Sequence, residues 1–436
     1  MMFLEFFIWG AWLPLIFAYL PALGFTPLQI GLILATFNVA ALVGMFFSNQ
    51  FADRTFAAEK FLAFSHLIGG LAIGALFWLK GPTSKEFPTV MAQLYDPAFL
   101  SFFGLMLIHS LLYVPTISIT NSIAFANLQD PQKEFGPVRL WGTIGWIAAA
   151  WPFVFILTDW DKVPAFGSVG FVEWLGAALG TPKSGEAMIA ARASTFLAAG
   201  IASVVLAVFS LTLPHTPPKV GSGTESLAWL EALKLLRFPF LLVLFIVTFI
   251  DAAVHQYYFF WTPGFLENVG VPGNWITPVM SIGQIAEILT MAILGLVLKN
   301  FGWRATMIVG VLGHAARFGV FAFLPNRELV IAVNVLHGIC YAFFFATVYI
   351  FVDEYFPKDV RASAQGLFNL LILGVGPLFT NLGAPYLASW FKIDDVKMDY
   401  YSVFLLPAGA SLVAAILLLL FFHPPKSKSA AETSVG

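Results

Sequence analysis

Long apolar runs, separated by short polar segments, are the main pattern along this chain. A helix that crosses a hydrocarbon core about 30 Å thick needs roughly 17 to 25 apolar residues. Twelve such runs occur, at about residues 1–24, 28–52, 59–80, 98–127, 138–158, 191–213, 237–266, 274–299, 303–324, 328–356, 361–388 and 400–423. The pattern predicts an all-α polytopic membrane protein with twelve transmembrane helices.

The polar segment after the sixth run divides the chain. Between Pro214 and Gly223 it carries three prolines and two glycines, which are turn formers typical of a linker. We therefore predict an N-terminal six-helix half at 1–213, a cytoplasmic linker at 214–236, a C-terminal six-helix half at 237–423 and a cytoplasmic tail at 424–436.

The composition indicates a protein embedded in a lipid bilayer, and it argues against nucleic-acid binding and against an intramolecular disulfide. Of the 436 residues, 59% are hydrophobic and 11% are charged, whereas soluble domains have about 25% charged residues. The net charge of −2 gives no basic surface for nucleic acid. Cys340 is the one cysteine of the sequence, so an intramolecular disulfide is excluded.

Lysine and arginine indicate the orientation. With a cytoplasmic N-terminus, 13 of the 22 basic residues fall in inner loops or in the tail, as the positive-inside rule requires. Residues 1–24 lack a positive n-region and a clear cleavage site, so we expect a membrane span rather than a signal peptide. Both termini are predicted to be cytoplasmic. The start codon and any partner of the long outer loop at 159–190 stay open.

The loops of the two halves resemble each other. Residues 130–139 and 353–361 both mix acidic and basic residues and end on an arginine that opens the next helix. Parallel six-helix repeats build the major facilitator transporters. Residues 49–54 with Lys60 are similar to the loop signature of that superfamily, without its usual glycines, and residues 295–304 look like a degraded second copy. We predict the major facilitator fold of two six-helix halves.

No enzyme signature occurs in the sequence. It has no glycine-rich phosphate loop after a strand, no His-Glu-x-x-His motif and no Cys/His cluster with metal-ligand spacing. We therefore expect no catalysis, no metal and no other cofactor. A few polar side chains lie within the apolar spans instead, and such groups mark solute or ion pathways.

The fifth span carries three candidate substrate-binding residues on one helical face. Arg139, Thr143 and Trp146 are spaced i, i+4 and i+7, which lines up a guanidinium, a hydroxyl and a large ring. The set suits a solute that combines a ring with a sugar. A positive flank at Arg139 and simple packing of Trp146 explain the spacing equally well.

The seventh span mixes polar groups with aromatic rings. Asp251 and His255 are i, i+4 neighbours, and they either satisfy each other or take part in transport. Gln256 faces another direction, and its amide offers both a donor and an acceptor, as the edge of a nucleobase does.

The eighth span carries the acid around which we expect the function to be organised. Glu287, with Gln284 on the same face, lies in a segment apolar enough to cross the bilayer, where an ionisable group is costly. Arg317 of the ninth span lies at similar depth and, with His314, is expected to brace this acid. If Glu287 faces a cavity that opens and closes, desolvation raises its proton affinity in the closed state. The alternative is a purely structural ion pair.

Several other polar residues are expected to join helices. His337 and Tyr341 share a face of the tenth span, but an intramembrane histidine often bonds one helix to another. Interhelical hydrogen bonding is also our interpretation of His66, His109, Asn121, Gln365, Asn369 and Asn381.

Seven segments, in order along nearly the whole chain, resemble the nucleoside:proton symporters of the major facilitator superfamily. They are Phe3–Leu13, Tyr113–Thr116, Arg139–Gly145, Leu211–His215, Ser281–Glu287, Arg317–Phe323 and Arg361–Gly366. The resemblance implies substrate contacts where the residue types match, at Arg139, Thr143, Gln256, Gln284 and Glu287.

The sequence departs from the family pattern at five further positions. Trp146 and Tyr341 each replace a phenylalanine, His337 replaces a tyrosine and Phe259 replaces an asparagine, so selectivity stays open. Ala342 replaces an intramembrane aspartate of the family. The resemblance therefore leaves Glu287 as the principal proton-coupling residue, with Asp251 as a second candidate.

The function implied is proton-coupled nucleoside uptake across the bacterial inner membrane by alternating access of the two halves. We expect a monomer. A transporter of another polar solute such as a sugar, an exporter, and a substrate-binding membrane sensor are the alternatives. The nucleosides accepted and the proton stoichiometry stay open.

Overall fold

The computed structural model describes residues 1–44, 56–84, 86–218, 233–356, 358–394 and 397–424. Within these ranges the chain is helical apart from loops and two isolated β-bridges. The acidic and basic segment at 49–54, most of the predicted linker and the predicted tail lie outside the described residues.

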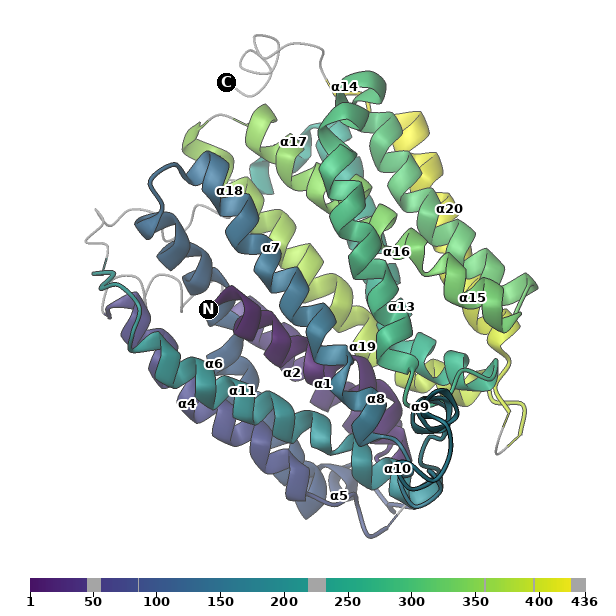
Figure 1. Cartoon of the computed structure of the whole chain (residues 1–436). Coiled ribbons are helices and arrows are strands. Elements are labelled where there is room, and N and C mark those ends of the chain that lie inside the picture. The colour runs from purple at the N-terminus through teal and green to yellow at the C-terminus, as the bar shows by residue number, and fades with distance from the viewer. Residues whose placement is uncertain (45–55, 85, 219–232, 357, 395–396, 425–436) are drawn as a thin grey trace. The chain divides into compact units, whose positions relative to one another are not determined.

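The helices follow the predicted spans closely (Figure 1). In chain order they are α1 (Met2–Ala22), α2 (Pro27–Val43), α4 (Ala58–Ala75), η2 (Leu76–Trp78), α5 (Val90–Leu94), α6 (Pro97–Asn127), α7 (Pro131–Ala150), α8 (Pro152–Ile156), α9 (Phe171–Gly180), α10 (Gly185–Arg192), α11 (Ser194–Ser210), η3 (Leu235–Arg237), α13 (Pro239–Asn268), α14 (Ile276–Phe323), α15 (Arg327–Val333), α16 (Val335–Cys340), η4 (Tyr341–Ala346), α17 (Thr347–Tyr355), α18 (Lys358–Asn369), η5 (Leu370–Val375), α19 (Gly376–Trp390) and α20 (Tyr400–Phe421).

Ten helical segments of the described chain are long and apolar enough to cross a membrane. The second predicted span is present as the shorter α2, which ends where the described residues stop. The eighth and ninth spans both lie in α14, where Gly302 interrupts the helix with φ 71° and ψ 176°. Because glycine lacks a Cβ atom, it adopts this positive φ without a clash. The prediction of a twelve-span membrane protein is confirmed.

The chain forms two compact units. The first unit comprises residues 1–220 and 259–281, and the second comprises 221–258 and 282–436. The division falls within α13 and within α14, so each of these helices contributes to both units. Each unit is described by itself below.

In the first unit, α4 packs on α6 and α11, and α1 packs on α7 and α11. Small residues bring α4 and α11 close together: a Cβ atom at Gly200 would lie 2.7 Å from the Cα atom of Gly74, closer than side chains approach backbone. Small residues at helix interfaces permit this approach in membranes, where close packing replaces the hydrophobic effect as the force between helices.

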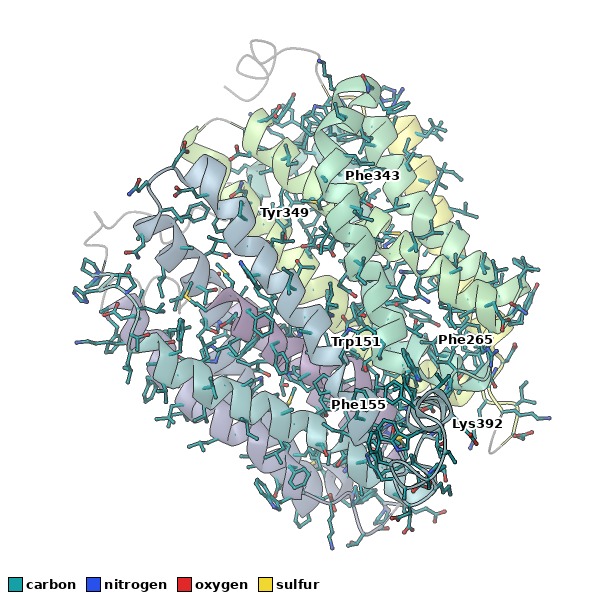
Figure 2. The ribbon with its side chains drawn as sticks, in the orientation of Figure 1. Trp151, Phe155, Phe265, Phe343, Tyr349 and Lys392 are labelled. Atoms are coloured by element: carbon teal, nitrogen blue, oxygen red, sulfur yellow. The ribbon has the colours of Figure 1, made fainter. Side chains whose placement is uncertain are left out.

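The segment between α8 and α10 packs against the connection of α13 and α14. The side-chain amide of Asn274 donates to the carbonyls of Val154 and Leu179, both over 3.1 Å, and Trp275 donates to Leu179 over 2.8 Å. Trp151, labelled in Figure 2, meets the ring of Trp275 edge-on at 6.1 Å. The long loop at 159–190 therefore has a partner within this unit.

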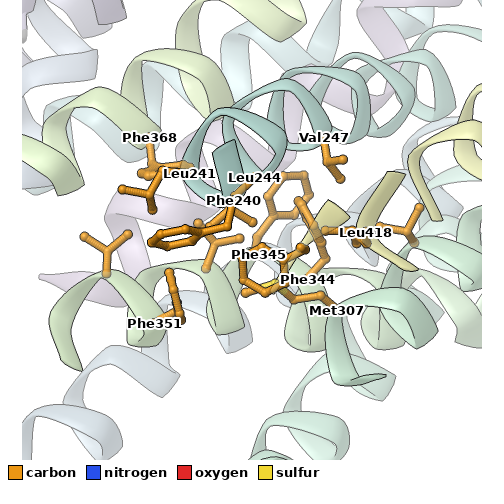
Figure 3. Close-up of a cluster of buried hydrophobic side chains, with 14 of the residues drawn as sticks. Phe240, Leu241, Leu244, Val247, Met307, Phe344, Phe345, Phe351, Phe368 and Leu418 are labelled. Atoms are coloured by element: carbon orange, nitrogen blue, oxygen red, sulfur yellow. The ribbon is translucent and has the colours of Figure 1, made fainter. Parts of the chain in front are cut away.

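The second unit has an apolar core built from α13, α14, η4, α17, α18 and α20 (Figure 3). Phe344, Val348 and Phe351 are each 0% exposed in it. Two segments of π-helix interrupt the helices of this unit: η4, which contributes Phe344 to the core, and η5. Single π-helical turns are frequent at functional sites, and η4 begins at Tyr341, one of the predicted site residues.

Large apolar side chains also cover the outer faces of the helices. On α20, Val413, Ile416 and Leu420 are each more than half exposed. These side chains belong to no packed core of the protein. In a membrane they contact lipid chains, which are as apolar as they are.

We predict that Gly200→Ala destabilises the protein, because the added methyl group meets the Cα atom of Gly74 and overpacking typically costs about 1–3 kcal/mol. Gly74→Ala is the matched control: its Cβ atom would lie 3.6 Å from Gly200, an ordinary contact. We expect the melting temperature of the purified protein to fall for Gly200→Ala alone. Equal melting temperatures for the two variants would contradict the close approach of α4 and α11.

Candidate functional site

The predicted face of α7 lies in the first unit and packs against α1. The guanidinium of Arg139 lies 4.0 Å above the ring of Phe6, a cation–π geometry. A Cβ atom at Gly142 would lie 2.6 Å from both of these side chains, so only glycine leaves room for the stack. Arg139, Thr143 and Trp146 are all partly exposed, which leaves them accessible to a solute.

An aromatic cluster continues from this face. Trp146 meets Trp9 edge-on at 5.3 Å and Phe259 at 6.4 Å, and Trp9 stacks on Phe37 at 4.9 Å. Sequence reasoning did not assign a role to Trp9. Its indole nitrogen is buried and donates to no acceptor among the described residues, although buried donors are usually paired. Arg139, Trp146 and the predicted Phe259 therefore belong to one cluster with Trp9, whose indole N–H has no acceptor among the described residues.

In the second unit, the side-chain amides of two glutamines differ in their hydrogen bonding. The Gln256 amide nitrogen donates to Oδ1 of Asn381 over 2.9 Å. Gln284 is 7% exposed, and its Oε1 receives no hydrogen bond from the described residues. A buried acceptor without a donor costs about 1–3 kcal/mol, so this oxygen favours binding of a ligand that donates to it.

Glu287, one turn after Gln284 on α14, is partly exposed. The backbone of Gly338 on α16 lies directly against it: a Cβ atom at Gly338 would approach the Glu287 nitrogen to 2.2 Å. Glycine therefore lets α16 reach α14 at the level of this acid. The backbone of Glu287 is therefore closely packed, while the residue as a whole keeps part of its surface accessible.

Arg317 is the centre of a buried polar cluster, which we call the arginine cluster: Asp251, His314, Arg317 and His337. The guanidinium of Arg317 is 0% exposed. It bonds to Nδ1 of His337 over 2.8 Å and to Nδ1 of His314 over 2.9 Å, and it lies 4.1 Å above the ring of Tyr258. Arg317 and His314 are thus bonded to each other, and His337 is a further partner. That these residues brace Glu287 stays a prediction.

The tautomers of both histidines follow from this geometry. A guanidinium has donors and no acceptor, so Nδ1 of His314 and Nδ1 of His337 accept, and both rings carry their hydrogen on Nε2. Nε2 of His314 points toward Asp251, whose Oδ1 lies 3.6 Å away. Among the described residues, neither Asp251 oxygen accepts a hydrogen bond, so the pairing considered between Asp251 and His255 is not made.

His337 is also stacked among rings. It lies 4.6 Å from Tyr258 and 4.7 Å from His255, and the hydroxyl of Tyr258 donates to Asn334 over 2.7 Å. Because Arg317 belongs to α14 and His337 to α16, their bond is the interhelical contact expected of an intramembrane histidine. Tyr341, which is partly exposed, lies 6.3 Å from His255.

Most of the other predicted interhelical bonds are present. Asn381 accepts from Gln256 and thereby joins α19 to α13. Asn369 accepts over 2.6 Å from Tyr349, which is labelled in Figure 2. Nδ1 of His109 bonds to the carbonyl of Gly69 over 3.0 Å. These bonds join neighbouring helices.

His66 has a charged partner that sequence reasoning missed. Its Nε2 lies 2.9 Å from Oε2 of Glu5 on α1, and its Nδ1 lies 2.9 Å from the hydroxyl of Ser203 on α11. Thr116 donates to the other oxygen of Glu5 over 2.9 Å, and Tyr113 donates to its backbone carbonyl over 2.6 Å. The available signal was an acid one turn into an otherwise apolar first span.

The described residues place the predicted site residues in two groups. Arg139, Thr143, Trp146 and Phe259 belong to the first unit, and Asp251, Gln256, Gln284, Glu287, His337 and Tyr341 belong to the second. Both groups contain polar donors, acceptors and rings. The two carboxyl groups, those of Asp251 and Glu287, belong to the second group. No group of three or more potential metal ligands of the His, Cys, Asp and Glu types occurs among the described residues.

Comparison with known proteins gives a consistent assignment. Residues 1–165 and 156–427 match the family described as nucleoside H+ symporter. The chain is 33% identical over 386 residues to the putative nucleoside transporter YegT of Escherichia coli K12, covering 87% of this chain and 80% of that protein. It is 26% identical over 438 residues to the xanthosine permease of the same organism, covering 95% and 93%.

Solved structures have the same fold. The crystal structure of the nucleoside transporter NupG superposes with a TM-score of 0.76 at 24% identity, covering 97% of this chain and 98% of that one. A D-xylose-proton symporter superposes with a TM-score of 0.64 at 14% identity, covering 97% and 96%. At these identities the superpositions show the fold alone, but the sequence matches run along the whole chain. The protein therefore belongs to the nucleoside H+ symporter family.

Proposed function

We propose that this membrane protein takes up nucleosides together with protons by alternating access. Membership of the nucleoside H+ symporter family supports the solute class and the coupling ion. The similarity to a D-xylose-proton symporter does not favour a sugar, because it concerns the fold alone. The relatives in sequence are transporters rather than enzymes.

In this proposal Arg139 and Thr143 contact the nucleoside from the first unit. The guanidinium, stacked on Phe6, offers hydrogen bonds in a fixed plane. Trp146 and Phe259 supply aromatic faces for the base, because every nucleobase presents a π-face to stack on. Trp9 adds an indole donor, which no described residue uses.

Gln256, Gln284 and Glu287 contact the nucleoside from the second unit. The observation that supports this best is the Oε1 atom of Gln284, which accepts no hydrogen bond from the described residues. A solute with a hydrogen-bond donor would satisfy this oxygen, and a solute without one would be disfavoured. Gln256 would exchange its bond with Asn381 for a bond to the base. His337 and Tyr341 supply rings, and His337 is braced by Arg317.

Glu287 is the proposed principal site of proton coupling. Ala342, which replaces an acid of the family, is 0% exposed and packs among Leu294, Phe343 and Ala346. That position is apolar and holds no proton. Glu287 is partly exposed, so opening and closing of the site would change its hydration and hence its proton affinity. Asp251 is the second candidate.

We propose further that the protein works as a monomer in the bacterial inner membrane, with both termini in the cytoplasm. The excess of lysine and arginine in the loops assigned to that side supports this orientation.

The proposed function predicts that vesicles containing the protein accumulate labelled uridine, adenosine or xanthosine when an inward proton gradient is imposed. Collapse of the gradient with an uncoupler should abolish accumulation, because the gradient is the energy source. Vesicles without the protein are the control. Failure to concentrate all three nucleosides would refute the proposal, and uptake unaffected by the uncoupler would refute coupling.

Glu287→Gln is expected to abolish gradient-driven accumulation while the protein still exchanges labelled for unlabelled nucleoside. The amide keeps the shape of the side chain and cannot carry the proton. Glu328→Gln, at an exposed acid on α15, is the control and should transport normally. A Glu287→Gln protein that still concentrates nucleoside would disprove the coupling role.

Arg317→Gln should destabilise the protein, because Nδ1 of His314 and Nδ1 of His337 each lose a buried donor, at about 1–3 kcal/mol apiece. It also removes a cation that attracts Asp251. Adding Asp251→Asn should recover part of that loss, which a double-mutant cycle on thermal stability measures. Arg327→Gln, at an exposed arginine, is the control and should change stability by less than about 1 kcal/mol. Additive losses from Arg317→Gln and Asp251→Asn would show that the two charges are independent.

A further inference from the structure

The carboxyl group of Glu5 and the imidazole of His66 form an acid–base pair at the interior of the first unit. Glu5 is 0% exposed and His66 is 1% exposed. Their atoms Oε2 and Nε2 lie 2.9 Å apart. The pair joins α1 to α4, and the roles proposed above do not use it.

Two hydrogen arrangements fit the contacts of His66 with Ser203. The hydroxyl oxygen of Ser203 lies 2.9 Å from the carbonyl oxygen of His66 and 2.9 Å from its Nδ1. When Ser203 donates to Nδ1, the imidazole carries its hydrogen on Nε2 and donates to Glu5. When Ser203 donates to the carbonyl, Nδ1 carries the hydrogen and Nε2 has a lone pair.

In the second arrangement the contact between His66 and Glu5 needs one additional proton. Without it, the lone pair on Nε2 would face a carboxylate oxygen in a buried place, which is unfavourable. With the proton on Nε2 the pair is ionic, and with the proton on Oε2 it is neutral. In both cases the pair holds a proton that it is able to lose.

We propose that the Glu5–His66 pair is a second proton-binding site of the transport cycle, occupied in this conformation and emptied in another. The proton moves between Oε2 or Nε2 and water, and the pair passes from zero net charge to one negative charge. This inference rests on the proposed function, since a cycle that moves protons gives the site its use.

Two titratable side chains of the described residues that act on the pair lie on α6. They are His109, which acts on His66, and Tyr113, which acts on Glu5. Arg139 on α7 acts on Tyr113 and lies over Phe6, the residue after Glu5. α11 contributes the hydroxyl of Ser203.

The transport test uses Glu5→Gln in vesicles, with Glu59→Gln as the matched control. Glu59 also pairs with a histidine, His215, over 2.8 Å, but that histidine is 66% exposed. Under an imposed gradient of about one pH unit, one proton fewer per nucleoside lowers the maximal accumulation ratio about tenfold. We expect this loss for Glu5→Gln, with exchange of nucleoside retained, and no loss for Glu59→Gln. An unchanged accumulation ratio in Glu5→Gln would overturn the proposal.

A second measurement does not depend on transport. Nitrogen NMR of histidine-labelled protein should show seven histidines, and His66→Gln identifies the signal of His66. We expect Nδ1 of His66 to carry a hydrogen in the wild-type protein and to donate it to Ser203. In Glu5→Gln the new amide donates to Nε2, so that nitrogen should remain an unprotonated acceptor throughout.

The two measurements separate the possible failures. If the wild-type protein moves no nucleoside but His66 behaves as described, the proposed function fails and the proton-binding pair stands. If transport is normal and His66 carries its hydrogen on Nε2 with Nδ1 as acceptor, the pair holds no additional proton. That second result would overturn the inference and leave the proposed function intact.

Discussion

Hydrocarbon offers no hydrogen bonds, and this constraint determines where the protein keeps its polar side chains. Buried polar groups therefore need partners within the protein, on the same helix or on another. Arg317 is the clearest case, because its guanidinium is 0% exposed and bonds to His314 and His337. Glu5 is the counterpart in the first unit, where His66, Thr116 and Tyr113 surround it. In each unit the charged group therefore fixes the packing of several helices.

The few polar atoms that stay unsatisfied are the informative ones. Buried donors and acceptors are paired in the great majority of cases, so the Oε1 atom of Gln284, the indole nitrogen of Trp9 and the carboxyl oxygens of Asp251 are exceptions among the described residues. Two of these are predicted site residues, and the third lies against Trp146. A transporter needs such groups, since a site that satisfies itself completely would gain nothing from its solute.

Glycines make these arrangements sterically accessible. Gly142 leaves room for the stack of Arg139 on Phe6, and Gly338 lets α16 reach the backbone of Glu287. In both places a methyl group would overlap the side chain or backbone that carries the proposed function. Close helix packing and the position of the site are thus consequences of the same small residues.

The sequence by itself determined the number and the approximate limits of the spans, because the thickness of a bilayer and the helical rise leave little freedom. It also located the intramembrane acids and amides. Only the tertiary structure decided their partners: Asp251 faces His314 rather than bonding to His255, His337 accepts from Arg317, and His66 meets Glu5 from a helix distant in the chain. Spacing along one helix fixes which side chains share a face, but hydrogen bonds between helices depend on packing that no single segment encodes.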